Sequence, residues 1–187
     1  MNTIIVEKRN LNAKPKQLRR SGIIPCVVYG GKLKESLSIQ ISQHTANNLF
    51  KLYREGSKVQ LQVEDQLIPV QIKEKAQDPL TNKLVHVSFE ALQADQKVNS
   101  LAHILLQSAD KVKGVLEKML LEIPYSSLPD HMIDTISIDL DGMPVGTVLT
   151  IGDIPEFTDE NVELQVDKGS IVLRISDKKR TSSEATA

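Results

Sequence analysis

The chain has 187 residues, of which 40% are hydrophobic and 25% are charged, and its formal net charge is −1. These values are ordinary for a folded soluble protein, so they exclude wholesale disorder, and no apolar run approaches the roughly 20 residues that a membrane span needs. The single cysteine, Cys26, excludes an internal disulfide and fits a reducing compartment.

The start of the chain, "MNTIIVEKRN", lacks the charged beginning and long apolar stretch of a signal peptide. We therefore expect a cytoplasmic protein. Its near-neutral total charge conceals two different halves. Residues 1–93 hold 14 Lys and Arg against 8 Asp and Glu, whereas residues 94–187 hold 9 against 16. Such asymmetry predicts two modules, of which the basic one meets a polyanion.

The first half of the chain reads as a mostly β domain with one packed helix. Ser42 is a natural N-cap for a helix over "SQHTANNLFKLYREG", and Gly56 stands where a left-handed residue would end it. The acidic pair Glu64–Asp65 predicts a hairpin turn. Apolar and alternating runs predict strands at 3–9, 22–31, 37–42, 58–65, 67–77 and 84–92.

The second half reads as short strands, which predict an antiparallel sandwich or barrel. The polar stretch "QADQKV" at 93–98 is the candidate linker. Residues 110–122 match a helical period as well as a strand, and we favour the strand. The strands are predicted within 98–107, 117–124, 134–142, 146–154, 161–166 and 170–176. These patterns predict a basic domain at 1–92, an acidic domain at 97–177 and a flexible tail at 178–187.

Catalytic and metal-binding patterns are weak. Cys26 lies in an apolar strand and reads as a small core residue rather than a nucleophile. "DLDG" resembles the opening of a calcium loop, but Thr150 stands where the bidentate Glu is needed. The histidines are far apart in sequence: His44, His86, His103 and His131. A nucleophile, a base and an orienting group for a hydrolase cannot be assembled from these residues. We therefore expect that the protein is not an enzyme and that it binds no metal, cofactor or small-molecule substrate.

The stretch "KPKQLRRSGIIPCVVYGGK" is the strongest functional signal, because four cations precede an apolar strand. Pro15 and Gly22 oppose regular structure, so we expect a loop that reaches several phosphates. The ring of Tyr29 could stack on a base or its hydroxyl could reach a phosphate; a half-buried strand tyrosine without a ligand is an equal alternative. No basic recognition helix is evident, which favours RNA over B-DNA. The four cations are Lys14, Lys16, Arg19 and Arg20.

"KPKQLRRSGIIPCVVYGG", followed by "AQDPLTNKLVHVSF", resembles the 5S-rRNA-binding ribosomal protein family of the bacterial large subunit. The later "LPDHMIDTISIDLDGMPVGTVLTIGDI" resembles the second domain of that family's longer form, also called general stress protein Ctc. The resemblance covers nearly the whole chain, in order. It implies a six-stranded β-barrel with helices for the first domain and an antiparallel β domain for the second.

The resemblance also implies docking on 5S rRNA in the central protuberance, through the basic loop and one barrel face. Its partners would be 5S rRNA and, through the acidic domain, neighbouring ribosomal proteins. Carried over position by position, the contact residues are Arg9 (or the neighbouring Asn10), Lys14, Lys16, Arg19, Arg20, Tyr29, His86 and Ser88.

Ser88 departs from the family, whose "HvDF" reads "HVSF" here. Serine makes a single uncharged hydrogen bond and cannot hold a bidentate geometry, so we expect 5S rRNA binding to weaken by roughly 1–3 kcal/mol. The leading hypothesis is a large-subunit ribosomal protein that binds 5S rRNA. The alternative is a divergent stress-response paralogue with the same fold and weakened 5S rRNA binding, acting as a protein-interaction module.

Overall fold

The computed structural model describes residues 3–177, so the predicted tail at 178–187 lies outside the described residues. The chain divides into two compact units. The first contains the residues up to Ser100 together with Leu128–Met132. The second contains Leu101–Ser127 and the residues from Ile133 onward. Strand β7 (Val98–Gln107) begins in the first unit and continues into the second.

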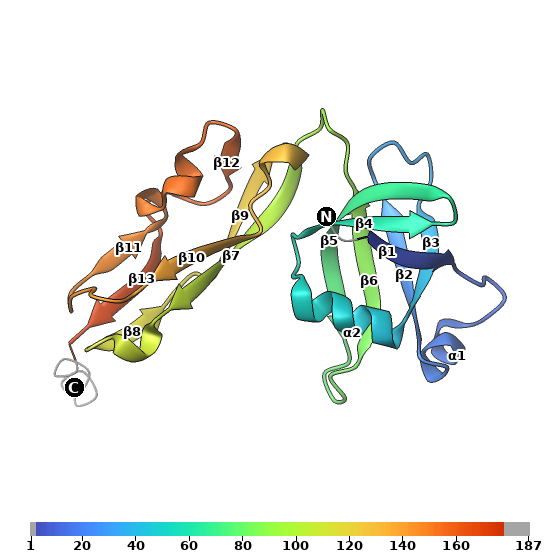
Figure 1. Ribbon diagram of the computed structural model, residues 1–187, viewed down its shortest axis with the longest axis horizontal. Helices are drawn as coiled ribbons and strands as arrows, with labels where there is room; N and C mark the ends of the chain where they lie inside the picture. Colours follow the sequence, from blue (N-terminus) through green and yellow to red (C-terminus); the bar gives the residue numbers. More distant parts are fainter. Residues whose placement is uncertain (1–2, 178–187) are drawn as a thin grey trace. The chain divides into compact units, whose positions relative to one another are not determined.

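The first unit is built on a closed six-stranded barrel, as expected, with the strand order β1-β3-β2-β6-β5-β4 (Figure 1). The barrel closes because β1 pairs with β4, and both this pair and β2–β6 are parallel. Inward-facing residues such as Ile24, Ile39 and Phe89 are almost fully buried and form its core. The strands are β1 (Thr3–Lys8), β2 (Ile23–Tyr29), β3 (Leu37–Ser42), β4 (Lys58–Val63), β5 (Gln66–Gln77) and β6 (Leu84–Ala91).

Helix α2 (Gln43–Leu52) begins as predicted, because the Ser42 side chain accepts a hydrogen bond from the Thr45 backbone N–H at 3.0 Å. Its end differs from the prediction. The chain turns extended at Tyr53, and Gly56 with φ +87° belongs to a separate turn whose N–H bonds the Ile72 carbonyl.

The basic stretch forms a short helix, α1 (Pro15–Arg20), so the prediction of a loop was wrong. Proline opposes a helix only in its interior; at the first helical position its missing N–H costs nothing. The Gln17 side chain accepts the Lys14 backbone N–H at 3.2 Å, and Gly22 with φ +74° follows the helix end. Leu18 is buried and anchors the helix on the barrel.

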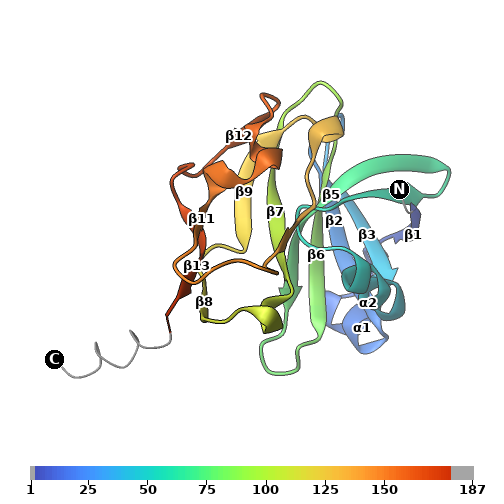
Figure 2. The same ribbon diagram turned by 60° about the vertical axis from the view of Figure 1, so that its left-hand side comes forward.

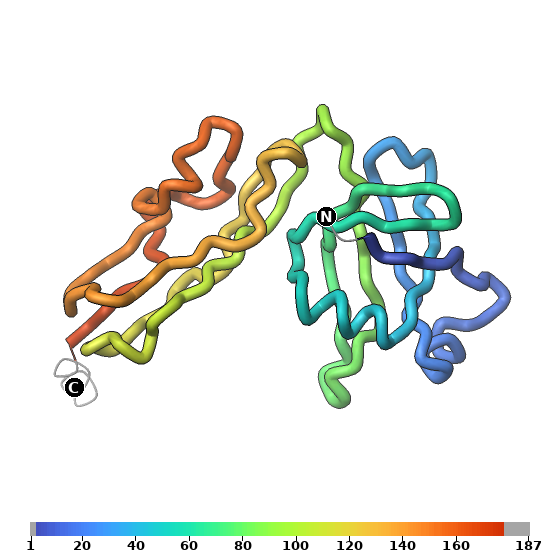
Figure 3. Tube along the Cα trace, in the orientation of Figure 1, coloured from blue at the N-terminus to red at the C-terminus, as the bar shows by residue number. Residues whose placement is uncertain are grey.

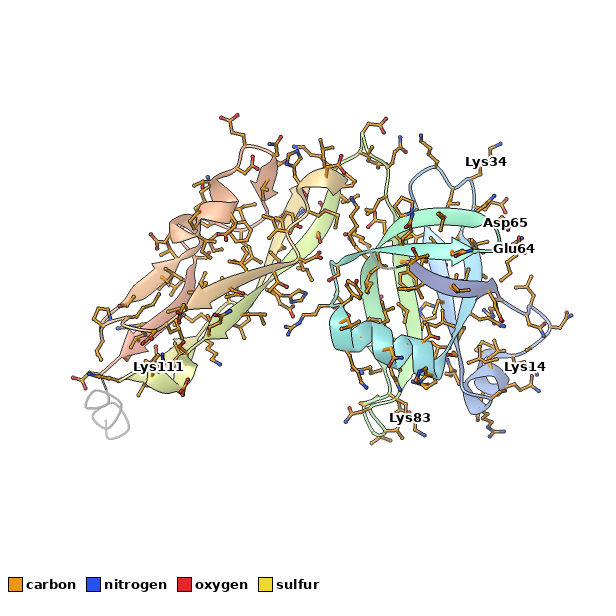
Figure 4. All side chains as sticks on the ribbon, viewed as in Figure 1. Lys14, Lys34, Glu64, Asp65, Lys83 and Lys111 are labelled. Carbon is orange, nitrogen blue, oxygen red and sulfur yellow. The ribbon has the colours of Figure 1, made fainter. Side chains whose placement is uncertain are left out.

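Both helices and the β5–β6 loop lie at the same end of the barrel (Figure 2). The continuous trace shows the long strands β5 and β6 joined by a loop that projects at this end (Figure 3). We call this the helical end. The β2–β3 loop, which carries Lys34, lies at the opposite end (Figure 4).

The second unit has two sheets, ordered β10-β7-β9-β12 and β11-β13-β8. Strand β10 runs parallel to β7, so the first sheet is mixed rather than wholly antiparallel as predicted. Within 110–122 the chain forms a short 3-10 turn and then strands, so the helical alternative was wrong. The remaining strands are β8 (Val115–Lys118), β9 (Glu122–Ser127), β10 (Thr135–Asp139), β11 (Val148–Thr150), β12 (Val162–Leu164) and β13 (Ile171–Ser176).

A buried tyrosine organises the core of the second unit. The Tyr125 hydroxyl accepts the Ile133 backbone N–H at 2.6 Å and lies 3.0 Å from the Ile133 carbonyl oxygen. Its ring packs at a tilt against Phe157, with the centroids 6.4 Å apart. Because this hydroxyl is satisfied, a large ring can be fully buried without an unpaired polar group.

Candidate nucleic-acid interface

Helix α1 presents its charged side chains to solvent. Leu18 is the buried residue of the helix, and Lys16, Arg19 and Arg20 around it are exposed. Lys14 precedes the first turn (Figure 4). The short helix is also tied to the barrel: the Arg19 guanidinium donates a hydrogen bond from Nη1 to the Val85 carbonyl on β6 at 3.3 Å. Arg19 is therefore held at the edge of the β6 face rather than swinging freely.

Arg9 follows the end of β1 and is only partly exposed. Its backbone N–H bonds the Ser38 carbonyl at 3.0 Å, and the neighbouring Asn10 N–H bonds the Gln40 side chain at 3.2 Å. The Nε of Arg9 is buried and lacks a hydrogen-bond partner among residues 3–177. An unpaired buried donor is costly and needs an acceptor that the described residues do not supply, whereas the Asn10 backbone N–H is already satisfied.

The period of two along β6 places His86, Ser88 and Glu90 on the outside of the barrel, while Val87 and Phe89 fill its core. Strand β2 lies beside β6, with Val27 opposite Ser88 and Tyr29 opposite Glu90. The predicted residues Tyr29, His86 and Ser88 therefore share one outer surface. We call it the β2–β6 face.

The electrostatics of His86 place both arginines near it. Burial lowers the pKa of His86 below its ordinary value; Glu74 opposes this effect, and Arg19 and Arg9 add to it. The imidazole is therefore neutral at pH 7 and can both donate and accept a hydrogen bond. Arg9 and Arg19 thus both act electrostatically on His86, although both arginines are distant from it in sequence.

Sequence reasoning missed Glu74. A β-bulge between Ile72 and Glu74 shifts the register of β5 by one residue, so Glu74 rather than Lys73 lies directly opposite Ser88. Simple alternation along β5 would have placed the lysine there. Glu74 is exposed, and both it and Glu90 raise the pKa of Tyr29, after the larger effect of partial burial.

Glu90 is already engaged at the other border of the face. Its carboxylate lies 3.2 Å from the Lys73 ammonium and accepts a hydrogen bond from the Gln71 side chain at 2.7 Å. Glu74 has no such ion-pair partner within residues 3–177. Of the two carboxylates, Glu74 is the one free to meet a ligand.

Other site chemistries find little support in the described part of the chain. No three His, Cys, Asp or Glu side chains in residues 3–177 are arranged to hold a metal ion. Burial raises the pKa of the Cys26 thiol to about 12, against a weaker opposing hydrogen bond from the Val87 backbone, so it is a poor nucleophile. Across the same residues, no helix has the length and apolar character to span a bilayer.

Comparison with known proteins matches both units. Residues 4–89 match the model of the Ribosomal L25p family, and residues 103–179 match that of the C-terminal domain of ribosomal protein TL5. Large ribosomal subunit protein bL25 of Gloeothece citriformis is 31% identical over 160 residues, covering 81% of this chain and 80% of that protein. The bL25 protein of Geobacillus thermodenitrificans is 34% identical over 145 residues, covering 74% and 67%. That of Listeria innocua is 27% identical over 179 residues, covering 91% and 84%.

Proposed function

Because the chain belongs to the Ribosomal L25p family, whose curated members are large-subunit ribosomal proteins and not enzymes, we propose that it binds 5S rRNA in the central protuberance. It is a ribosomal protein with a role in translation, and rRNA binding is implied by the family. The contact surface consists of α1 and the β2–β6 face. Its other partners are neighbouring ribosomal proteins, and its location is the ribosome in the cytoplasm.

One observation carries the proposal: the hydrogen bond from Arg19 to the Val85 carbonyl joins α1 to the β2–β6 face. A guanidinium held at this edge keeps further donors for phosphate oxygens. Arg9 acts on the same face, because its charge lowers the pKa of His86. The cations of α1 thus neutralise phosphates of the RNA backbone, while Tyr29 offers a ring and His86 offers hydrogen-bonding groups to the bases.

Glu74 places a carboxylate beside position 88, where this chain has serine in place of the family's aspartate. A carboxylate on an RNA-binding face is useful when it accepts hydrogen bonds from base amino groups. Glu74 holds such a carboxylate one strand away from Ser88, and the side chains of directly opposite residues are near neighbours. We propose that Glu74 supplies this acceptor, which reduces the loss of affinity expected from serine.

The second unit is not suited to lie on RNA. Its described residues hold 13 Asp and Glu against 5 Lys and Arg. That charge repels phosphate and is complementary to basic proteins, so this unit meets neighbouring ribosomal proteins rather than rRNA.

Ser88 and the acidic second unit are the observations that favour the alternative, a stress-response paralogue that keeps the fold and binds 5S rRNA weakly. In that case the protein acts mainly through protein contacts. The two functions differ in their affinity for 5S rRNA, so one measurement separates them.

The test is a titration of 5S rRNA with the full chain at several salt concentrations, with excess tRNA as competitor. Specific binding predicts survival against tRNA and a steep fall of log affinity with log salt concentration, because each neutralised phosphate releases counterions. Equal affinity for both RNAs would contradict the proposal and support the paralogue.

A further inference from the structure

A cleft of about 750 Å³ opens at the helical end of the barrel. The residues that line it come from the end of α1, the length of α2, the β5–β6 loop and the adjacent ends of β5 and β6. The cations that line it are Arg19, Arg20, Lys51, Lys75 and Lys83. We call it the helical-end cleft.

Within the described part of the chain, the cations of the cleft lack direct ion-pair partners. Among the described residues that line the cleft, none carries a carboxylate, and none of the five cations has an ion pair within 4.0 Å in residues 3–177. Asp78 is the acid that interacts electrostatically with Lys83. Its carboxylate also accepts hydrogen bonds from the backbone N–H groups of Leu80 and Thr81, at 2.9 and 3.3 Å, and it offsets the charge of Lys83 only in part. Five cations around one concavity, of which Asp78 offsets one in part, attract a polyanion.

Two of the cations are held in place. Lys75 lies over the ring of Phe50, with its ammonium 5.6 Å from the centroid, and Arg19 bonds the Val85 carbonyl. Because these side chains lose less conformational entropy when a ligand binds, they favour binding at a defined site over non-specific electrostatic attraction.

The remaining polar lining is mostly amides. On α2 the Gln43 amide donates to Asn47 at 3.1 Å, and Asn48 lies 3.0 Å from the His44 ring nitrogen Nε2. Side-chain amides offer both donors and acceptors, which match the base edges of an unpaired nucleotide. The cleft is larger than a single phosphate needs, and its lining includes few apolar side chains, so a protein partner finds little to bury there.

We propose that the helical-end cleft binds the sugar–phosphate backbone and an unpaired nucleotide of a second RNA segment, next to the segment on the β2–β6 face. The inference rests on the proposed rRNA-binding function and extends it. Arg19 borders both surfaces, since it lines the cleft and bonds β6. The protein would then hold RNA on both sides of α1.

The test uses Lys51→Ala/Lys83→Ala in the full chain, since both side chains are exposed and lie outside the β2–β6 face. The matched control is Lys32→Ala/Lys34→Ala, which removes the same charge from the opposite end of the barrel (Figure 4). For 5S rRNA, the cleft variant should lower the log–log salt slope by about 1.4, or roughly 0.7 per lost single-strand phosphate contact. The control should leave the slope unchanged.

Two further measurements do not depend on the slope. Hydroxyl-radical footprinting should show one protected 5S rRNA segment that disappears with the cleft variant while another remains. On the unmutated chain, bound 5S rRNA should shield Lys51 and Lys83 from acetylation, but not Lys34. Unchanged slope and footprint, with both cleft lysines still reactive in the complex, would overturn the inference.

The two proposals fail in different ways. If the unmutated chain does not prefer 5S rRNA over tRNA, the proposed function fails. If the unmutated chain binds and His86→Ala weakens it while the cleft variant matches its control, the cleft inference alone fails.

Discussion

Glu74 on β5 and Ser88 on β6 are cross-strand partners on the outside of the barrel, brought into register by the bulge that displaces Lys73. The pair places one carboxylate and one hydroxyl side by side. The proposed RNA-binding surface therefore presents their combined chemistry rather than that of Ser88 alone.

A first prediction concerns this pair. Glu74→Gln should weaken 5S rRNA binding by about 1–3 kcal/mol if the carboxylate accepts a base amino group. Ser88→Asp alone should not tighten binding, because two carboxylates directly opposite each other repel and the second one adds repulsion toward the RNA phosphates. In the Glu74→Gln background the same Asp should restore much of the lost affinity.

A double-mutant cycle of 5S rRNA affinities at fixed salt measures this coupling. Additive effects of the two substitutions would show that Glu74 and Ser88 act independently and that Glu74 does not replace the missing aspartate.

The position of Glu74 opposite Ser88 shows what sequence patterns could and could not predict. Alternation along each strand was enough for the barrel strands, because one face of each strand is buried. The bulge near Lys73 has no local signal in the sequence, so the register beyond it could not be predicted. Likewise Pro15 suggested a loop, because its effect depends on whether it lies at a helix start or in a helix interior.

The candidate site was predictable only in part, for a related reason. The resemblance supplied residues on α1, β2 and β6, but the side-chain neighbours of each come from pairing between distant strands. The cleft residues Lys51 and Lys83 lie on α2 and on the β5–β6 loop, and only the closed barrel brings them to one end.

A second prediction concerns α1. Arg19→Ala/Arg20→Ala should weaken 5S rRNA binding and lower the log–log salt slope by up to about two units, because two phosphate contacts are lost. The fold should persist, since Leu18 still anchors the helix and both arginines are exposed. Arg19→Lys should bind less tightly than the unmutated chain, because arginine can bond the Val85 carbonyl and a phosphate at the same time and lysine lacks this planar fork.

Salt-dependent binding isotherms of these variants, with circular dichroism as the folding control, check this prediction. Equal binding by the Arg19→Lys variant and the unmutated chain would show that charge alone acts at position 19.

A third prediction concerns pH. Because burial holds the pKa of His86 low in the free protein, protonation is disfavoured there until RNA arrives. Nearby phosphates stabilise the imidazolium and raise its pKa in the complex, so binding takes up a proton. Affinity should therefore increase as the pH falls from 7.5 to 5.5, by no more than about tenfold per pH unit, the limit for one linked proton.

The stability of the free protein should instead decrease as the pH falls. Its folded-state pKa for His86 lies below the unfolded value of about 6.5, so this group's contribution to stability is complete above that pH and declines as the pH falls through the folded pKa. His86→Gln should remove most of the pH dependence of 5S rRNA binding, whereas His131→Gln, at an exposed histidine outside both proposed RNA-binding surfaces, is the control and should keep that dependence. An unchanged pH profile in the His86 variant would contradict the assignment.

A fourth prediction uses Cys26 as a reporter of the barrel. The thiol is 3% exposed and its pKa is raised to about 12, so the reactive thiolate is scarce in the folded protein at pH 8. Alkylation by iodoacetamide should therefore be slower than in denaturant by a factor above about 10³, given an unfolded thiol pKa near 8.5. Since the chain has one cysteine, on β2, this rate reports on the barrel rather than on the second unit.

Binding of 5S rRNA should slow the alkylation of Cys26 further, because a ligand that binds only the folded barrel lowers the population of its opened form. The Arg19→Ala/Arg20→Ala variant should label slowly without RNA, since its barrel is intact, and should gain little protection when RNA is added. Mass spectrometry of the alkylated chain over time measures both rates. Labelling as rapid as that of a solvent-exposed thiol would show that β2 does not pair stably with β3 and β6. That result would contradict the arrangement of the β2–β6 face.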